Sequence, residues 1–239
     1  MAKEKKFPKH IAMIMDGNGR WATNRGKSRV FGHNAGMKAM KNIVKHCGDI
    51  GLEYLTVYAF STENWKRSQE EVSGIFGLLI KYIDSELASL HKNNVRVNIL
   101  GDFSIMEDAV KNRLEKTIEL TKNNSGLIFN IALNYGSRAE ILMAAKSLAF
   151  DYKNNLLKGD DINEEEFSKR LFTGILDIPD PDLVIRTSGE IRLSNFLMWQ
   201  LAYSEMAFTD TLWPDFKPEE LDEIIQDYMY RERRFGGRL

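Results

Sequence analysis

The sequence predicts an α/β protein with a mostly parallel central sheet of about six strands and helices on both faces. Short runs rich in Val, Ile, Leu and Phe alternate with helix-like segments along the whole chain. These runs lack polar alternation, which indicates strands that are covered on both faces. No linker, internal repeat or low-complexity segment interrupts the 239 residues, so we expect a single domain over 1–239.

The expected strands are short apolar segments separated by long connections. A strand, a crossover helix and the next strand form the unit that builds parallel sheets, and this order recurs along the chain. We expect strands at 10–15, 54–60, 94–100, 127–134, 182–187 and 206–209.

Helix starts are predicted from capping signals. The spacing Ser-x-x-Glu of a capping box precedes apolar-periodic stretches at 68–71, 104–107 and 137–140. Asn34 is expected to cap a helix that runs to Ile50, and Pro218 to open a last helix toward Tyr230. The polar stretch 151–166 is predicted to be a loop.

The predicted helix at 69–91 has a wider apolar face than a helix resting on a sheet requires. A central core helix is the common interpretation of such a face. The alternative is that part of the face lines a cavity for a long apolar ligand.

Composition restricts the class of protein. The chain is 43% hydrophobic and has a formal net charge of -1, which argues against a general nucleic-acid binder. Cys47 is the single cysteine, so no internal disulfide forms, and we interpret it as a small core residue. With neither an N-terminal apolar segment nor a membrane-spanning run, we expect a cytoplasmic protein.

The segment HIAMIMDGNGRWA at 10–22 is the strongest candidate for a ligand site. An apolar strand ends at Asp16, and a turn through Gly17, Asn18 and Gly19 leads to Arg20. Such a turn brings backbone N–H groups close to an anion at the carboxyl end of a strand. We therefore expect this loop to bind a diphosphate.

Charge is distributed unevenly around this loop. Positions 17–48 contain no Asp or Glu but several basic residues, of which Arg20, Arg25, Arg29 and His33 lie in or beside the loop. Arginine forks favour phosphate groups as partners. A solvated surface patch is the alternative interpretation.

Two motifs resemble sites of other classes. Gly17-x-Gly19-x-x-Ala22 matches a dinucleotide fingerprint, but no acidic residue follows at the ribose-binding distance of about 20 positions. Asp160-Asp161-x-x-Glu164 resembles the aspartate-rich motif of all-helical prenyl synthases, yet it occurs once in a chain that is not all-helical. We interpret it as a solvated loop before a helix.

Two further polar clusters accompany predicted strands, at 59–67 (AFSTENWKR) and 186–205 (RTSGEIRLSNFLMWQLAYSE). The carboxyl ends of parallel strands meet at one edge of a sheet, so we expect these clusters to converge with Asp16. The arginines around the Gly17 loop form one basic cluster, and Arg186 and Arg192 form a second. Together with the acids Asp16 and Glu205, they suggest two phosphorylated substrates and a hard cation such as Mg²⁺.

These motifs are similar to those of the cis-prenyltransferase family, and the similarity extends nearly from end to end. It covers HIAMIMDGNGRWA, GHNAG at 32–36, AFSTENWKR, NYGSRAEI from Asn134, the 186–205 segment, LWPDF from Leu212 and RERRFGG near the C-terminus.

The resemblance implies repeated cis condensation of isopentenyl diphosphate onto farnesyl diphosphate with Mg²⁺, to give undecaprenyl diphosphate, precursor of the bacterial cell-wall carrier lipid. It also implies a homodimer, a hydrophobic tunnel for the growing tail, and peripheral membrane contact for product release. Burial of the tail is worth about 0.8 kcal/mol per CH₂.

The resemblance further implies the site residues. Asp16 is the essential carboxylate and a Mg²⁺ ligand, Glu205 a second ligand, and Asn64 the position usually given as proton acceptor. Substrate-binding positions are Gly17, Asn18, Gly19, Arg20, Trp21, Arg29, His33, Ser61, Thr62, Glu63, Trp65, Arg67, Arg186, Arg192, Leu193 and Ser194. The segment Arg234-Phe235-Gly236 resembles the C-terminal R-x-G element of the family.

Some alternatives remain open from sequence. An amide such as that of Asn64 is a poor general base, so the proton could instead leave with the diphosphate or through a relay. A different product length, a non-catalytic partner subunit of the same fold and a nucleotide-binding oxidoreductase are the competing functions. The residues of the tunnel floor are not identified by sequence.

Overall fold

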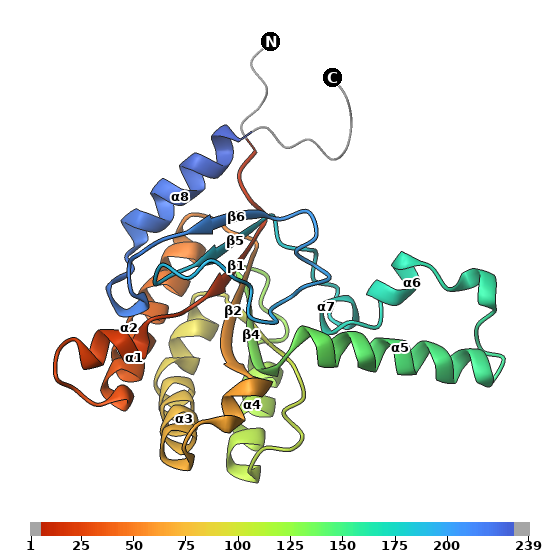
Figure 1. The fold of residues 1–239 in the computed structure, drawn as a ribbon, viewed down its shortest axis with the longest axis horizontal. Coiled ribbons are helices and arrows are strands. Elements are labelled where there is room, and N and C mark those ends of the chain that lie inside the picture. The colour runs from red at the N-terminus through yellow and green to blue at the C-terminus, as the bar shows by residue number, and fades with distance from the viewer. Residues whose placement is uncertain (1–5, 232–239) are drawn as a thin grey trace.

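All six expected strands form, and together they build one sheet. The computed structural model describes residues 6–231, and its sheet is parallel throughout, in the order β3-β4-β2-β1-β5-β6 (Figure 1). The strands are β1 (His10–Ile14), β2 (Tyr54–Ser61), β3 (Arg96–Leu100), β4 (Ile128–Tyr135), β5 (Leu183–Arg186) and β6 (Glu205–Phe208). The carboxyl ends of β1, β2 and β5 are therefore neighbours.

Helices cover both faces of this sheet (Figure 1). One face carries α2 (Arg29–Asp49), α3 (Gln69–Lys92), α4 (Asp108–Thr121) and α8 (Pro218–Tyr230). The other side carries α5 (Ser137–Lys153), α6 (Glu164–Ser168) and α7 (Phe172–Ile175). Across residues 6–231, no helix has the length and apolar character needed to cross a membrane.

Short elements fill the connections at the sheet edges. They are α1 (Asn18–Thr23) and the 3₁₀ turns η1 (Thr62–Lys66), η2 (Gly159–Asp161) and η3 (Trp213–Asp215). Of these, α1, η1 and η3 directly follow or adjoin strand ends, and they contribute Asn18, Asn64 and Trp213 to the candidate site.

Successive side chains of each strand point to opposite faces of the sheet, which divides the core into two layers. Ile11 and Met13 of β1 face the larger cluster beneath α2, α3, α4 and α8. Ala12 and Ile14 face the smaller cluster, which includes Phe196 and the chain after β5. Both layers are apolar, which explains why the strands are continuous hydrophobic runs in the sequence.

One predicted capping signal is confirmed and one helix start is corrected. The Ser68 hydroxyl accepts a hydrogen bond from the Glu71 amide at the start of α3. Helix α2 begins earlier than expected, because Ser28 rather than Asn34 caps it by accepting a bond from the Phe31 amide.

The other two capping boxes are wrong. Ser104 bonds to Asp102 in a local turn, and α4 begins only at Asp108. At α5 the Ser137 hydroxyl accepts from the Met198 amide instead, because tertiary contacts recruit the side chain away from the helix end.

The predicted loop at 151–166 is shorter than expected. Helix α5 extends to Lys153, and α6 begins at Glu164 with Asn163 as its cap. Asp160 and Asp161 lie exposed in η2, as expected for a solvated loop.

A chain of buried polar side chains crosses the sheet on its smaller-core face. Asn98 donates to Asn130, Asn130 donates to the Thr56 hydroxyl, and that hydroxyl contacts His10 Nε2 at 2.7 Å. His10 Nδ1 lies 2.6 Å from the Pro179 carbonyl, which accepts its proton. A strand shifted by one residue would break these hydrogen bonds, so this row of polar side chains specifies the register of the strands.

The buried His10 makes the stability of the fold sensitive to acid. Burial lowers the pKa of His10 from 6.5 to about 4, despite opposing effects of Pro179 and Asp182. The unfolded chain therefore binds a proton that the folded chain excludes, and His10 stabilises the fold fully above pH 6.5 but progressively less toward pH 4.

We predict that the free energy of unfolding falls more steeply between pH 6.5 and pH 4 in the wild type than in His10→Gln. The difference in slope is at most about 1.4 kcal/mol per pH unit. Urea unfolding across this range measures both slopes, and parallel slopes would contradict a neutral buried His10.

Candidate functional site

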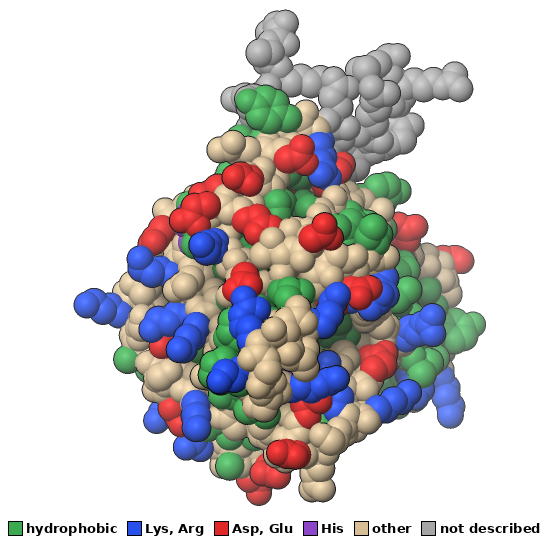
Figure 2. Space-filling model, turned by 60° about the vertical axis from the view of Figure 1, so that its left-hand side comes forward, with side chains coloured by type: hydrophobic (Ala, Val, Ile, Leu, Met, Phe, Trp, Pro, Cys, Tyr) green, Lys and Arg blue, Asp and Glu red, His purple; other side chains and the backbone are tan. Residues whose placement is uncertain are grey.

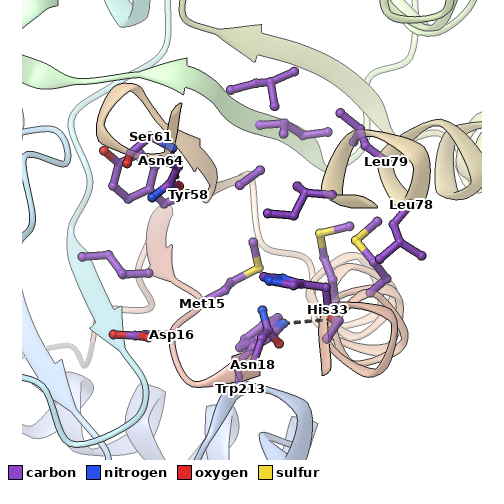
Figure 3. Close-up of a pocket in the computed structure, with 18 of the residues that line it drawn as sticks. Met15, Asp16, Asn18, His33, Tyr58, Ser61, Asn64, Leu78, Leu79 and Trp213 are labelled. Atoms are coloured by element: carbon purple, nitrogen blue, oxygen red, sulfur yellow. Dashed lines mark hydrogen bonds between the residues drawn. The ribbon is translucent and has the colours of Figure 1, made fainter. Parts of the chain in front are cut away.

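A cavity of about 240 Å³ opens at the carboxyl ends of β1, β2 and β5 (Figure 3). Its polar lining comes from eight predicted site residues: Asp16, Asn18, His33, Ser61, Asn64, Arg67, Arg186 and Ser194. Its remaining lining is chiefly apolar: Ile14, Met15, Met37, Met40, Tyr58, Ala59, Ile75, Leu78, Leu79, Ile131, Leu133 and Trp213. A charged mouth thus leads into an apolar interior.

Helix α3 supplies one wall of this interior through Ile75, Leu78 and Leu79. Its other apolar residues, such as Tyr82 and Ile83, are buried in the core. Part of the wide apolar face therefore lines a cavity and the rest lies in the core, while binding of a long apolar ligand there stays a prediction. In Figure 3, Leu78 and Leu79 lie across the cavity from Asp16.

The loop after β1 has the geometry that its glycines predict. Gly17 adopts φ 106°, and a Cβ there would lie 2.9 Å from Leu212 and 3.1 Å from Ser188. Its amide donates to Asp16 Oδ1 at 2.7 Å. Only glycine fits this turn, which directs the Asp16 carboxylate toward the cavity.

Asp16 is held by an ion pair with Arg186 at the end of β5, 2.8 Å away. Burial opposes ionisation of Asp16, but the hydrogen bond and charge of Arg186, the Gly17 amide and the charge of Arg20 lower its pKa overall. Asp16 is therefore ionised at neutral pH.

Arg186 also organises the segment that follows β5. Its guanidinium donates to Ser194 Oγ at 2.7 Å and to the Arg192 carbonyl, while its Nε has no partner. The segment contains left-handed residues at Ser188, Ser194 and Asn195. Backbone of this kind persists where surrounding contacts determine it, and Arg186 supplies several of those contacts.

Two more arginines meet at Glu190 beside this segment. Arg20 bonds the Ser188 hydroxyl and lies 3.5 Å from Glu190, which also pairs with Arg192. Arg20 lies 3.9 Å from Asp16 as well. Arg20 and Arg192 are therefore close neighbours of the Asp16–Arg186 pair, although neither lines the cavity itself.

A second cationic cluster surrounds Glu71 in the first turn of α3. The Glu71 carboxylate lies 2.8 Å from Arg67, 3.5 Å from His33 and 3.7 Å from Arg29. Burial lowers the pKa of His33, the Arg67 charge adds to this, and Glu71 only partly opposes it. Arg67 and His33 line the cavity, while Glu71 is not among its lining residues.

The segment after β2 folds into η1 through its own polar side chains. The Ser61 amide donates to Asn64 Oδ1 at 3.0 Å. Glu63 accepts from Thr62 and, at 2.8 Å, from Asn195 in the segment after β5. Thr62 and Glu63 thus join two strand ends and do not line the cavity.

Trp65 and Trp21 also lie outside the cavity. Trp65 donates to Asn134 Oδ1 at 2.8 Å and stacks on Phe76. Trp21 donates to Asp215 at 2.7 Å and stacks on Phe31. Both tryptophans hold loops of the site in position.

Two predicted site residues point elsewhere. Leu193 packs against the smaller core cluster. Glu205 begins β6 and is paired in register with Leu183, at the edge of the sheet opposite Asp16. Its carboxylate lies 3.1 Å from Arg231.

The expectation that Glu205 converges with Asp16 is therefore wrong within one chain. Glu205 precedes its strand whereas Asp16 follows its own, and parallel strands keep those positions at opposite edges. The segment Arg234-Phe235-Gly236 lies outside the described residues.

The basic stretch 17–48 meets acidic residues contributed by other segments. Arg25 pairs with Asp215, Lys41 with Glu86, and His46 with Asp222. Arg25 therefore lies outside the site. Lys and Arg side chains remain frequent across the middle of the face shown in Figure 2.

The GHNAG and LWPDF motifs explain how the mouth is packed. A Cβ at Gly36 of α2 would overlap the Asn18 side chain, and one at Gly32 would overlap the Asn18 carbonyl. Trp213 is buried against them, with its indole donating to the Gly36 carbonyl at 2.9 Å and its amide to the Asp16 carbonyl at 3.0 Å.

Sequence reasoning missed Glu71, Glu190, Thr187 and Trp213. Thr187 accepts from the Asp16 amide at 3.0 Å and donates to the Asp16 carbonyl at 2.7 Å. The sequence pattern predicts only a capping role for Glu71, and the excess of cations at 17–48 is the one signal that indicates a counter-charge from another segment.

We predict that Gly36→Ala weakens binding of inorganic diphosphate and lowers stability by about 1–3 kcal/mol, because the new methyl group displaces Asn18 beside Asp16. Gly48→Ala on the same helix is the matched control, since a Cβ there meets nothing within 4 Å. Calorimetric binding and thermal unfolding test both variants. Equal behaviour of the two would contradict the close packing.

We predict that Glu71→Gln raises the affinity for inorganic diphosphate several-fold. The amide keeps an acceptor for Arg67 but removes the negative charge that compensates the two guanidinium groups of Arg29 and Arg67. Glu70→Gln, an exposed neighbour in the same turn, is the control and should leave affinity unchanged. An unchanged affinity in Glu71→Gln would show that these cations do not face the anion.

Comparison with known proteins finds relatives over almost the whole chain. A family model described as putative undecaprenyl diphosphate synthase matches residues 14–236. An isoprenyl transferase from Clostridium perfringens is 51% identical over 234 residues, 98% of this chain and 92% of that protein. One from Fusobacterium nucleatum is 53% identical and covers 98% of both chains.

Two solved structures share the fold. Lavandulyl diphosphate synthase from Lavandula x intermedia, in complex with dimethylallyl diphosphate, matches with a TM-score of 0.93 and 34% identity over 97% of this chain and 99% of that one. A probable undecaprenyl diphosphate synthase from Campylobacter jejuni matches with a TM-score of 0.79 and 36% identity over 97% of this chain and 100% of that one. The chain therefore belongs to the undecaprenyl diphosphate synthase family of cis-prenyltransferases.

Proposed function

We propose that the protein condenses isopentenyl diphosphate repeatedly onto farnesyl diphosphate, with cis geometry, to form undecaprenyl diphosphate. The single observation that carries this proposal is the Asp16 carboxylate, paired with Arg186, at the mouth of an apolar cavity. A charged mouth suits a diphosphate, and an apolar interior suits the prenyl chain attached to it. The product would serve as precursor of the bacterial cell-wall carrier lipid.

The two basic clusters support two diphosphate substrates. We assign the allylic diphosphate to the cluster of Arg29, His33 and Arg67 with Arg20 and the Gly17 loop. We assign isopentenyl diphosphate to Arg186, Arg192 and Ser194. Guanidinium donors stabilise the charge that develops on the departing diphosphate when the allylic C–O bond breaks.

The residues present fit a Mg²⁺ ion that binds jointly with substrate. Asp16 is ionised, and its oxygens retain lone pairs beyond those used by Gly17 and Arg186. No group of three or more Asp, Glu, His or Cys residues that could hold a metal occurs between residues 6 and 231. Mg²⁺ usually takes one or two carboxylates and completes its shell with phosphate oxygens and water. When bound, it would neutralise charge on the leaving diphosphate.

Asn64 is suited to donate a hydrogen bond rather than to accept a proton. Its Oδ1 already accepts a hydrogen bond from the Ser61 amide, Asn64 lines the cavity, and the other polar group of its side chain, Nδ2, is a donor. We therefore propose that Asn64 orients a diphosphate or the new double bond, and that the proton leaves with the diphosphate.

We also propose a homodimer, supported by the outer face of α5. Figure 1 shows α5 extending away from the sheet. Leu142, Met143, Phe150 and Tyr152 on this helix are exposed, as is Tyr203 after β5. Exposed apolar side chains in such a group commonly mark a protein–protein interface.

The dimer is tested by sedimentation velocity. We predict that the wild type sediments as a dimer and that Phe150→Glu shifts it toward the monomer, because a charge would be buried in the interface. Lys116→Glu, exposed on α4 on the other side of the sheet, serves as the control for a change of charge. A monomeric wild type would contradict this proposal.

Incubation with farnesyl diphosphate, isopentenyl diphosphate and Mg²⁺ tests the activity. We predict that mass spectrometry detects undecaprenyl diphosphate and that Asp16→Ala abolishes turnover without unfolding the chain. Product of another length would revise the proposed product alone. No condensation by the wild type, or full activity of Asp16→Ala, would overturn the mechanism.

A further inference from the structure

Two hollows meet at the seam between α2 and α3. The first is the interior cavity described above. The second is an outer groove of about 160 Å³ lined by Asn34, Met37, Lys38, Lys41, Leu78, Lys81, Tyr82, Ser85 and Glu86. Met37 from α2 and Leu78 from α3 line both hollows, so these two side chains form part of the partition between inside and outside.

The seam is fixed at its ends and apolar between them. Near the mouth, Glu71 binds Arg29 and His33 across it, and further along Lys41 lies 2.7 Å from Glu86. From Glu71 to Glu86 the helix rises about 22 Å. Within the described chain, no hydrogen bond or ion pair joins α2 to α3 between these contacts.

The partition is made of deformable parts. Met37 is unbranched and can change rotamer at low cost. Gly77 leaves the adjacent side of α3 thin, since a Cβ there would meet nothing within 4 Å, whereas a Cβ on Gly74 would lie 3.1 Å from the apolar side chain of Val30 on α2. Separating Met37 from Leu78 therefore breaks apolar contacts only.

The interior is small for the proposed product. A cavity of about 240 Å³ lies below the roughly 300–1,000 Å³ of pockets for drug-sized ligands. An undecaprenyl chain is much longer than the farnesyl primer. Each CH₂ that remains in water costs about 0.8 kcal/mol, so an elongating tail requires further apolar surface.

We propose that the α2–α3 seam is a lateral exit for the polyprenyl chain, which passes between Met37 and Leu78 into the outer groove. This inference rests on the proposed function. The Tyr82 ring and the aliphatic stems of Lys38, Lys41 and Lys81 would cover the emerging tail, while the ammonium groups remain in water.

Alkylation of an introduced cysteine tests this exit. Cys47 is buried, and burial raises the pKa of its thiol to about 12, so it does not compete for N-ethylmaleimide. Ser85→Cys places a thiol in the outer groove. Ser89→Cys, one turn further along α3 and outside the groove, is the matched control, since both serines are exposed.

We expect bound undecaprenyl diphosphate to slow alkylation of Ser85→Cys several-fold and farnesyl diphosphate to leave it unchanged, with no effect of either on Ser89→Cys. Competition against farnesyl diphosphate confirms that the long ligand is bound. Binding without protection at Ser85→Cys, or equal protection at both positions, would overturn the exit. Failure of undecaprenyl diphosphate to bind would overturn the proposed function and the exit with it.

Discussion

The ion pair between Asp16 and Arg186 is the interaction on which the site depends. It joins the carboxyl ends of the neighbouring strands β1 and β5, and only 4% of the Arg186 side chain is exposed. Because Arg186 is buried, removing Asp16 leaves a guanidinium without its counter-charge, which is destabilising. Arg186 also bonds Ser194 and the Arg192 carbonyl, so the position of the segment after β5 depends on the same guanidinium.

Close packing around this pair gives the mouth a rigid frame. Asn18 lies against Gly32 and Gly36 of α2, and Trp213 holds α2 and the Asp16 backbone together. The interior is softer, since methionine and leucine side chains line it and separate it from the outer groove. A rigid charged mouth and a deformable apolar interior suit a substrate whose head is constant while its tail lengthens.

Much of this arrangement could be predicted from sequence, because the relevant signals are local. Continuous apolar runs identified every strand, and the loop from Asp16 through Gly17 requires a turn that only glycine fits. The polar residues that follow β1 and β2, and Arg186 at the end of β5, were correctly expected at one edge of the sheet. The wide face of α3 correctly suggested a cavity wall.

The remaining features depend on contacts between distant segments. Ser104 and Ser137 have the spacing of helix caps, yet a local turn and the Met198 amide use them instead. Arg29 and His33 approach Glu71 from the distant helix α2, which no local pattern reveals. Glu205 lies at the start of β6, and the start of a parallel strand is at the edge of the sheet opposite the site, so its nearness to a strand in the sequence does not bring it to Asp16.

A double-mutant cycle on Asp16 and Arg186 tests the central claim most directly. The measured quantity is the single-turnover rate of the first condensation in the wild type, Asp16→Asn, Arg186→Gln and the double variant. If the pair acts as one unit at the diphosphate, the double variant will lose little more than the worse single variant. Fully additive losses in the free energy of activation would contradict this account.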